Sequence, residues 1–227
     1  MKKTVLIFFT FLSISCIAQF SKTHYIPPIT AQNTLVEDHY LYISTPSVTD
    51  VNFKIIEIGG TIITGVVSNT IPYVHPIGAG NSTQLFTSKN NIGTIQNKGF
   101  IIEAENLVYA SVRVNSSRNT NGSFNHAGGL VSKGNSALGK TFRLGAMLNP
   151  NVDNTLLNFA SILSTENNTT VTISNLPVGT IFTDGTVYTV PIVVTLGKNE
   201  SYVMALENYF GNNFPSNSSK MIGALVE

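Results

Sequence analysis

Two glutamates and one serine are the candidates for a hydrolytic site. Glu103 and Glu105 lie two residues apart on a predicted strand and therefore share one face. Glycosidases use two carboxylates about 5–10 Å apart with separated pKa values, whereas we expect both glutamates in the same solvated surroundings at a strand end. Ser136 lies in the stretch GNSAL (134–138), which has leucine where a nucleophile elbow requires glycine. We therefore predict no catalytic residue and no enzymatic activity.

Metal-ligating side chains are few and scattered. Asn149, Asn151 and Asp153 alternate as in an oxygen-rich calcium loop, but calcium sites usually use several carboxylates and this stretch supplies one. A turn is the prediction there, with calcium as the alternative. No two of the four histidines stand at paired ligand spacing, so we expect packing or turn roles and neither a metal nor a cofactor. These histidines are His24, His39, His75 and His126.

Two tyrosines are the candidate ligand-binding residues. Tyr40 and Tyr42 share one face of a predicted strand because they lie two residues apart. If that face is exposed, the rings form a platform on which a sugar stacks, although the chain has no tryptophan. Cross-strand packing is the ordinary role of such a pair. A carbohydrate-binding module is therefore kept as an alternative function.

The composition limits the partners. Charged residues make up 11% of the 227 residues and the net charge is +1, with 42% hydrophobic residues. Nucleic-acid binding normally needs a basic surface, so it is excluded. Asn, Thr and Ser replace the missing charge, and they favour turns and, for Thr, strands. This composition indicates a polar, uncharged, extracytoplasmic β protein.

Residues 1–18 have the three parts of a secretory signal peptide. Lys2 and Lys3 precede an apolar run over 4–12, and Ala18 supplies the small residue at the cleavage position. About ten apolar residues extend only about 15 Å as a helix, too short for a bilayer. We predict export, a secreted or outer-surface location and no transmembrane span after cleavage. Lipidation of Cys16 is the alternative, although the usual aliphatic residue upstream is missing.

The remaining chain reads as short strands. Alternating or β-branched runs occur at 39–44, 51–58, 61–67, 100–105 and 107–114, separated by Gly, Asn, Pro and Ser. Strand spacing of about 10–12 residues is typical of sandwiches, barrels and propellers. No stretch combines a helical period with capping residues. The fold class is therefore predicted as all-β and antiparallel.

The strands repeat along the chain. Residues 42–45 (YIST) match 162–165 (ILST), an offset of 120 (163 minus 43), and this register continues to Val51 and Val171. Pro72 with Pro191, and Gly78 with Gly197, extend the match near the same offset (191 minus 72, and 197 minus 78, both 119). We predict two tandem β-repeat units, 19–138 and 139–227. Sandwich-like units are favoured over propeller blades, because one copy carries more than four strands.

Two further expectations follow from this alignment. The second copy reaches the point equivalent to Glu105 at residues 221–227, whereas the first copy continues with the strand 107–114. We therefore expect the second unit to be truncated and the chain to be the front part of a longer protein. A natural terminus at a surface strand is the alternative. The polar stretch 115–125 is interpreted as a connector between the copies.

Five phrases carry a resemblance to a known family. They are 21–28 (SKTHYIPP), 39–46 (HYLYISTP), 97–105 (NKGFIIEAE), 126–134 (HAGGLVSKG) and 164–173 (STENNTTVTI). Together they resemble the N-terminal region of large secreted proteins from gliding bacteria of the Bacteroidota. That region is similar to the IgGFc-binding protein N-terminal domain family.

The resemblance implies a β-repeat ectodomain of a long surface protein, in which further repeats and a gliding-motility-type sorting domain for type IX secretion follow. It supplies no binding residue that maps onto this chain, and antibody binding is not transferred. We therefore predict a non-catalytic, secreted or cell-surface binding or adhesion module. Its expected partners are an extracellular protein or glycan and further domains of the same chain. A carbohydrate-binding accessory module and a purely structural stalk are the alternatives.

Overall fold

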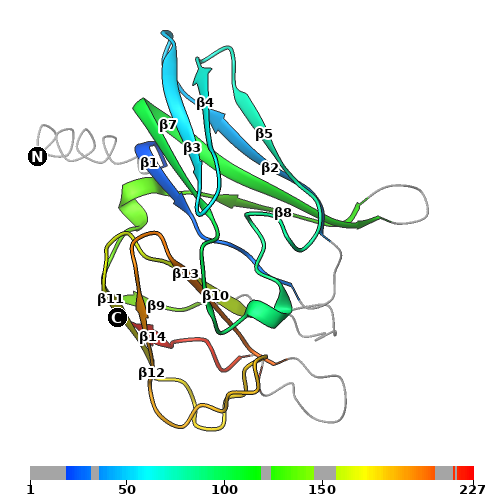
Figure 1. Cartoon of the computed structure of the whole chain (residues 1–227), viewed down its shortest axis with the longest axis vertical. Helices are drawn as coiled ribbons and strands as arrows, with labels where there is room; N and C mark the ends of the chain where they lie inside the picture. Colours follow the sequence, from blue (N-terminus) through cyan, green and yellow to red (C-terminus); the bar gives the residue numbers. More distant parts are fainter. Residues whose placement is uncertain (1–18, 32–35, 119–123, 146–156, 208–216, 218) are drawn as a thin grey trace, which may run out of the picture.

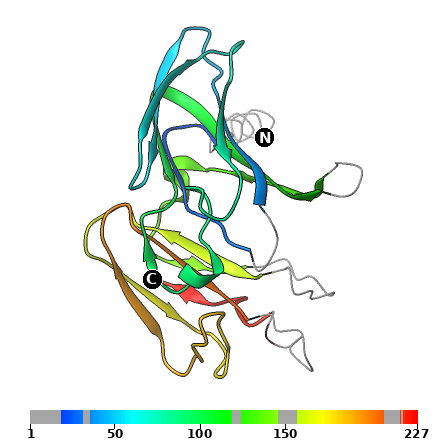
Figure 2. The same cartoon turned by 45° about the vertical axis from the view of Figure 1, so that its right-hand side comes forward.

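The computed structural model describes residues 19–31, 36–118, 124–145, 157–207, 217 and 219–227. Every pairing between named strands is antiparallel, and short 3-10 turns, η2 (Lys89–Asn91) and η3 (Gly134–Ala137), interrupt the strands. The strands form two lobes, one above the other in Figure 1 and again after rotation in Figure 2. The prediction of an all-β, antiparallel, sandwich-like fold is confirmed.

The first unit, the upper lobe, contains seven of the described strands. They are β1 (Ser21–Ile26), β2 (Val36–Ser44), β3 (Val51–Glu57), β4 (Ile62–Val67), β5 (Tyr73–Gly78), β7 (Phe100–Arg118) and β8 (Phe124–Val131). The order is β4-β3-β7-β2-β5, with β1 and β8 also paired to β7. This arrangement gives a nearly closed, barrel-like sheet.

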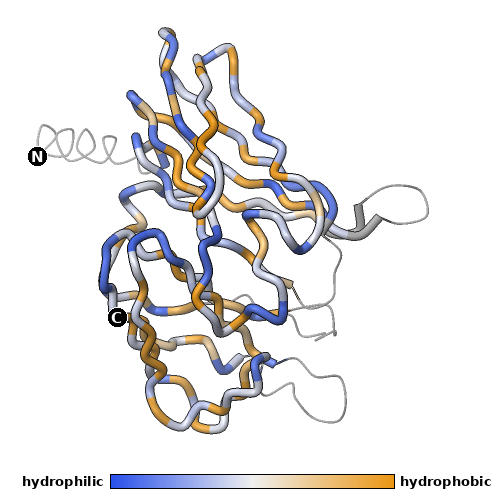
Figure 3. Tube along the Cα trace, in the orientation of Figure 1, coloured by the Kyte–Doolittle hydropathy of each residue, from blue (hydrophilic) through white to orange (hydrophobic). Residues whose placement is uncertain are grey.

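The 19-residue β7 organises this sheet. Its first half pairs with β1 and β3, and its second half pairs with β2 and β8. Alternate residues of the strands face inward, for example Leu41 and Ile43 on β2, and both are fully buried. The apolar side chains from both halves therefore form one core cluster, and polar and apolar stretches alternate along the strands (Figure 3).

The second unit, the lower lobe, has two sheets around its own core. One sheet has the order β12-β11-β14-β9 and the other the order β10-β13-β6. A separate cluster of buried apolar side chains fills the space between the sheets. The strands are β6 (Ile95–Gln96), β9 (Phe142–Arg143), β10 (Phe159–Leu163), β11 (Thr169–Ser174), β12 (Ile192–Leu196), β13 (Ser201–Ala205) and β14 (Leu225–Val226).

Strand β6 crosses from one lobe to the other. It lies in the connection from β5 to β7 and pairs with β13, Gln96 opposite Ser201. Gly93 N–H donates to Val203 O at 2.8 Å, and Ser201 Oγ donates to Gln96 O at 3.1 Å. All five residues of β13 are buried, since Tyr202 and Met204 belong to the second core and β10 and β6 cover both edges of the strand. Residues from the first predicted repeat thus complete a sheet of the second.

The two units share a sheet order. The order β4-β3-β7-β1 in the first unit corresponds to β12-β11-β14-β9 in the second, and the pair β5-β2 corresponds to β13-β10. Strand β12 therefore stands in the place of β4. The predicted matches of Pro72 with Pro191 and Gly78 with Gly197 are wrong, because they set β12 against β5. The connection from β11 to β12 (175–191) is longer than that from β3 to β4 (58–61), and this shifts the later strands.

The predicted connector 115–125 is also wrong for the residues that the structure describes. Strand β7 continues to Arg118 and β8 begins at Phe124, with Ser116 opposite His126 and Arg118 opposite Phe124. These residues belong to a hairpin inside the first unit. Backbone hydrogen bonds between β7 and β8 stabilise the extended conformation of this hairpin. Its polar residues and glycines are therefore compatible with a strand. Residues 119–123 lie outside the described residues.

Residues 1–18, including Cys16, lie outside the described residues as well. Within the described ranges, no helix has the length and apolar character that a membrane crossing requires.

Candidate functional site

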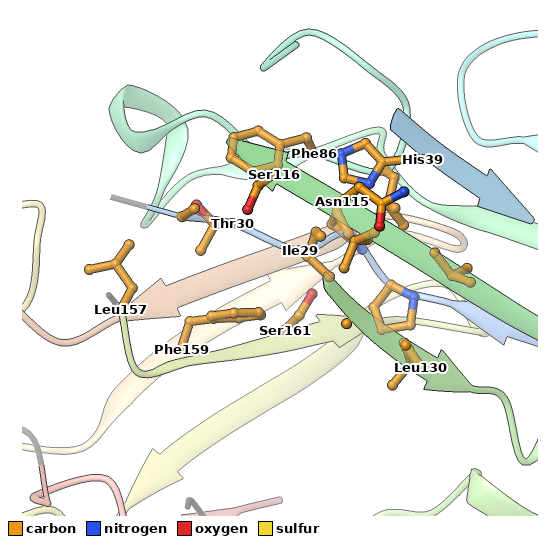
Figure 4. A pocket seen from close by; sticks show the side chains of 18 of the residues that line it. Ile29, Thr30, His39, Phe86, Asn115, Ser116, Leu130, Leu157, Phe159 and Ser161 are labelled. Carbon is orange, nitrogen blue, oxygen red and sulfur yellow. The ribbon is translucent and has the colours of Figure 1, made fainter. Parts of the chain in front are cut away.

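A cavity of about 550 Å³ lies between the two units. Figure 4 shows Phe159 and Ser161 of β10 on one side and His39, Phe86 and Ser116 on the opposite side. The inner face of β7 and β8, the segment 27–31 and part of the β5–β7 connection supply the remaining lining. Apolar side chains dominate these walls, among them Ile29, Leu85, Val112, Val114, Leu130 and Leu157.

Among the described residues that line this cavity, His39 is the one titratable side chain. It is 2% exposed, and neither Nδ1 nor Nε2 has a hydrogen-bond partner within the described part of the chain. Burial lowers the pKa of His39, and the nearby Asp38 carboxylate opposes this shift. The ring is therefore neutral at pH 7, with one donor and one acceptor nitrogen, both enclosed by the protein.

The register of β2 changes on both sides of His39. The pairing with β5 shifts between His39 and Tyr40, and the pairing with β7 shifts between Val36 and His39. Such bulges bend a strand and redirect a side chain. Because His39 stands at an inward position of the alternation that continues with Leu41 and Ile43, its imidazole lies among apolar groups at the end of the first core.

Strand β10 supplies the opposite wall. Ala160 and Ile162 pack against the second core, so Phe159 and Ser161 face the cavity. Ser161 Oγ is buried, and no described residue is its hydrogen-bond partner. Two buried polar groups that lack partners, His39 and Ser161, therefore lie in one apolar cavity. Such groups are often satisfied by ordered water or an ion, since leaving them unpaired costs about 1–3 kcal/mol each.

The chemistry of this lining favours binding. Among the described residues of this lining, His39 is the one titratable group and most of the other side chains are apolar. An apolar ligand or apolar side chains would fill this cavity, because His39 Nδ1, His39 Nε2 and Ser161 Oγ are enclosed by the protein and apolar groups make up most of the remaining lining.

The predicted platform residues lie outside the cavity, on the outer face of the first sheet. Tyr40 and Tyr42 are both half-buried, with ring centroids 6.3 Å apart and ring planes 54° apart. The guanidinium carbon of Arg113 lies 5.3 Å from the centroid of Tyr42, a cation–π contact. The tilt means that the two rings do not form one flat surface. Sugar binding at this face stays a prediction.

The carboxylate and serine candidates are at the surface. Glu103 and Glu105 are both exposed on β7, and Glu105 Oε2 accepts a hydrogen bond from Asn52 Nδ2 at 2.8 Å. Ser136 is exposed on η3. None of the three lines the cavity between the units.

The histidines are dispersed. His24 is fully buried; its Nε2 donates to Val108 O at 2.8 Å, and burial lowers its pKa. His75 Nε2 lies 3.9 Å from Glu57 Oε1, and burial lowers the pKa of His75 as well. The side chain of His126 is outside the described part of the chain. Asn149, Asn151 and Asp153 also fall outside it. Where the structure is described, no three His, Cys, Asp or Glu side chains are placed to hold a metal ion.

The sequence contained a partial signal for this site. A histidine at an inward position of an alternating strand is a polar group placed in a core, and His39 has that position. Phe159 and Ser161 carried no such signal, because their place in the cavity depends on how the two units pack.

Comparison with protein-family models, with curated proteins and with solved structures gave no match to this chain. The resemblance to secreted gliding-bacterial proteins therefore stays a prediction.

Proposed function

We propose that this chain is a non-catalytic binding module of a secreted or surface-displayed protein, with an adhesive role. The cavity between its two units holds the ligand. The observation that carries the proposal is the apolar lining of a cavity of about 550 Å³, in which Ile29, Val112, Leu130 and Phe159 are among the apolar side chains and His39 is a buried imidazole. A cavity of this size suits a ligand or a few side chains of a partner.

The lining favours a protein partner over a glycan. A sugar presents many hydroxyl groups, and each needs a hydrogen-bond partner when it is buried. The polar side chains in the lining are those of Thr30, His39, Asn115, Ser116 and Ser161, and Thr30 Oγ1 already donates to Thr87 O at 2.8 Å. Apolar side chains of a protein partner bury well against the remaining surface.

The cavity can be tested with Nile red, an uncharged dye whose emission changes in an apolar site. We expect saturable binding to the wild-type protein and loss of that binding in Ser161→Phe, which fills the cavity. Ser136→Phe is the matched control, because it adds the same side chain at an exposed turn. Binding that is absent, or that is equal in Ser161→Phe and the wild type, would contradict the proposal.

Export is tested separately. We expect a chain produced with residues 1–18 to be found outside the inner membrane with Gln19 as its first residue. Mass spectrometry of the mature protein measures this directly. A protein that keeps residues 1–18 and stays in the cytoplasm would contradict export, and a diacylglycerol-modified Cys16 would replace free secretion by a lipid anchor.

A further inference from the structure

Strand β10 pairs with another described strand along one edge, whereas its counterpart in the first unit, β2, pairs along both edges. In the first unit, β2 lies between β5 and the second half of β7, with Ile43 opposite Tyr73 and Ala110. In the second unit, β13 stands in the place of β5, with Ile162 opposite Tyr202. Among the described residues, no strand pairs with the other edge of β10.

The hydrogen-bond pattern shows which backbone groups face that open edge. Leu206 N–H donates to Asn158 O, and Ser164 N–H donates to Glu200 O, both at 2.9 Å. Even-numbered residues of β10 therefore direct their backbone groups to β13, because the direction alternates along an antiparallel strand. The N–H and C=O groups of the odd-numbered Phe159, Ser161 and Leu163 face away from it.

The open edge and the cavity belong to the same strand residues. The side chains of Phe159 and Ser161 line the cavity, and the backbone groups of these residues form the edge. A strand added beside β10 would place every second side chain next to this apolar lining. In the first unit, the second half of β7 lies beside β2 and carries Val112 and Val114 two residues apart, and both side chains line the cavity. A strand with the same alternation of apolar residues therefore suits the open edge of β10.

We propose that the open edge of β10 accepts an antiparallel strand from another polypeptide, with apolar residues at alternate positions entering the cavity. This inference rests on the proposed function and names its ligand class, an extended protein segment. A regular row of donors and acceptors, two residues or about 6.6–6.8 Å apart, matches a polypeptide backbone. The added strand takes the position that the second half of β7 holds beside β2.

A labelled peptide with the sequence of residues 107–115, LVYASVRVN, is the probe, because this segment includes β7 residues that pair with β2. We expect saturable binding to the full chain by fluorescence polarisation. A peptide of the same composition with the alternation scrambled is expected to bind at least about tenfold more weakly, because fewer of its apolar side chains enter the cavity.

Ser161→Pro tests the edge itself. Its N–H faces away from β13, so proline leaves the β10–β13 ladder intact but removes a donor and projects its ring toward the added strand. We expect at least about a tenfold loss of peptide affinity. Thr64→Pro is the matched control: Thr64 is exposed on the terminal strand β4, and the bond from Glu57 N–H to Thr61 O places its N–H away from β3. This control is expected to bind like the wild type.

Amide hydrogen exchange gives a readout that does not depend on a variant. Peptide binding is expected to slow exchange at Ser161 and Leu163 in the wild-type protein, because their N–H groups become hydrogen-bonded. Unchanged exchange at saturating peptide, or equal affinity of Ser161→Pro and the wild type, would overturn the inference. If Nile red still fills the cavity while the alternating peptide does not bind, strand addition fails and the proposed function stands. If both probes fail, both proposals fall.

Discussion

Thr45 and Ser164 hold equivalent positions in the two units. Each is a buried hydroxyl that accepts a hydrogen bond from the backbone N–H two residues later, Ser47 at 3.2 Å and Glu166 at 3.3 Å. The two residues are 119 positions apart (164 minus 45), whereas Val51 and Val171 are 120 apart. The turn after β10 therefore contains one residue more than the turn after β2.

This turn connects the two halves of the first sheet, and Thr45 stabilises it. Thr45 Oγ1 also donates to Leu107 O at 2.7 Å, where β7 passes from one set of neighbours to the other. Thr45→Val keeps the shape of the side chain but removes both bonds, so we expect a loss of about 1–2 kcal/mol in the free energy of unfolding. Urea unfolding measures it, and Val48→Ala in the same turn, where Val48 is 81% exposed, is expected to change little.

The repeat was predictable where alternation is strong. Buried side chains occur at every second position of β2 and β3, for example Leu41 and Ile43, or Val51 and Phe53. The predicted bounds of these two strands are therefore close to the observed bounds. The predicted alignment of the two units has no gap at the turn after β2, and it is wrong by one residue in β10. Ile162, not Leu163, packs into the core as Ile43 does. The hydroxyls of Thr45 and Ser164 reveal this shift only once their hydrogen bonds are known.

Other strands could not be predicted from their local sequence. Strands β6, β9 and β14 are two residues long, and no periodicity can be measured over two residues. β8 contains Gly128 and Gly129, which are depleted in strands, and its conformation depends on pairing with β7. The cavity depends on contacts far apart in sequence, such as His39 and Ser161 facing one space, so composition and spacing could not predict it.

His39 and His24 are expected to respond oppositely to the same substitution. His39→Leu removes two polar atoms that have no partner, so the free energy of unfolding should stay unchanged or rise by about 1 kcal/mol. His24→Leu removes the donor to Val108 O and should lower it by about 1–3 kcal/mol. Both residues are at most 2% exposed, so the pair is matched in burial. Equal destabilisation in chemical denaturation would show that His39 is paired within the protein.

Stability is expected to decrease in mild acid. Burial lowers the folded-state pKa of His24, His39 and His75 from the ordinary value of 6.5. The unfolded chain therefore binds more protons than the folded chain below about pH 6.5, and the free energy of unfolding falls as the pH falls through the folded pKa values. Urea midpoints from pH 7.5 to 5.0 measure this. His39→Leu should reduce the slope, whereas a flat profile in the wild type would contradict the assignment of buried neutral rings.

Gly65 of β4 lies beneath the ring of its cross-strand partner Phe53, and this close approach explains a glycine inside a strand. A Cβ on Gly65 would fall 2.8 Å from Phe53 Cε1 and closer still to Cζ, so alanine must displace a ring that is 2% exposed in the first core. We expect Gly65→Ala to lower the free energy of unfolding by about 1–3 kcal/mol, the usual cost of overpacking. Gly145→Ala is the control, because a Cβ there meets no atom of the described residues within 4 Å. If thermal or urea unfolding shows the two variants equally stable, the ring of Phe53 moves freely and does not fix the β3–β4 pair.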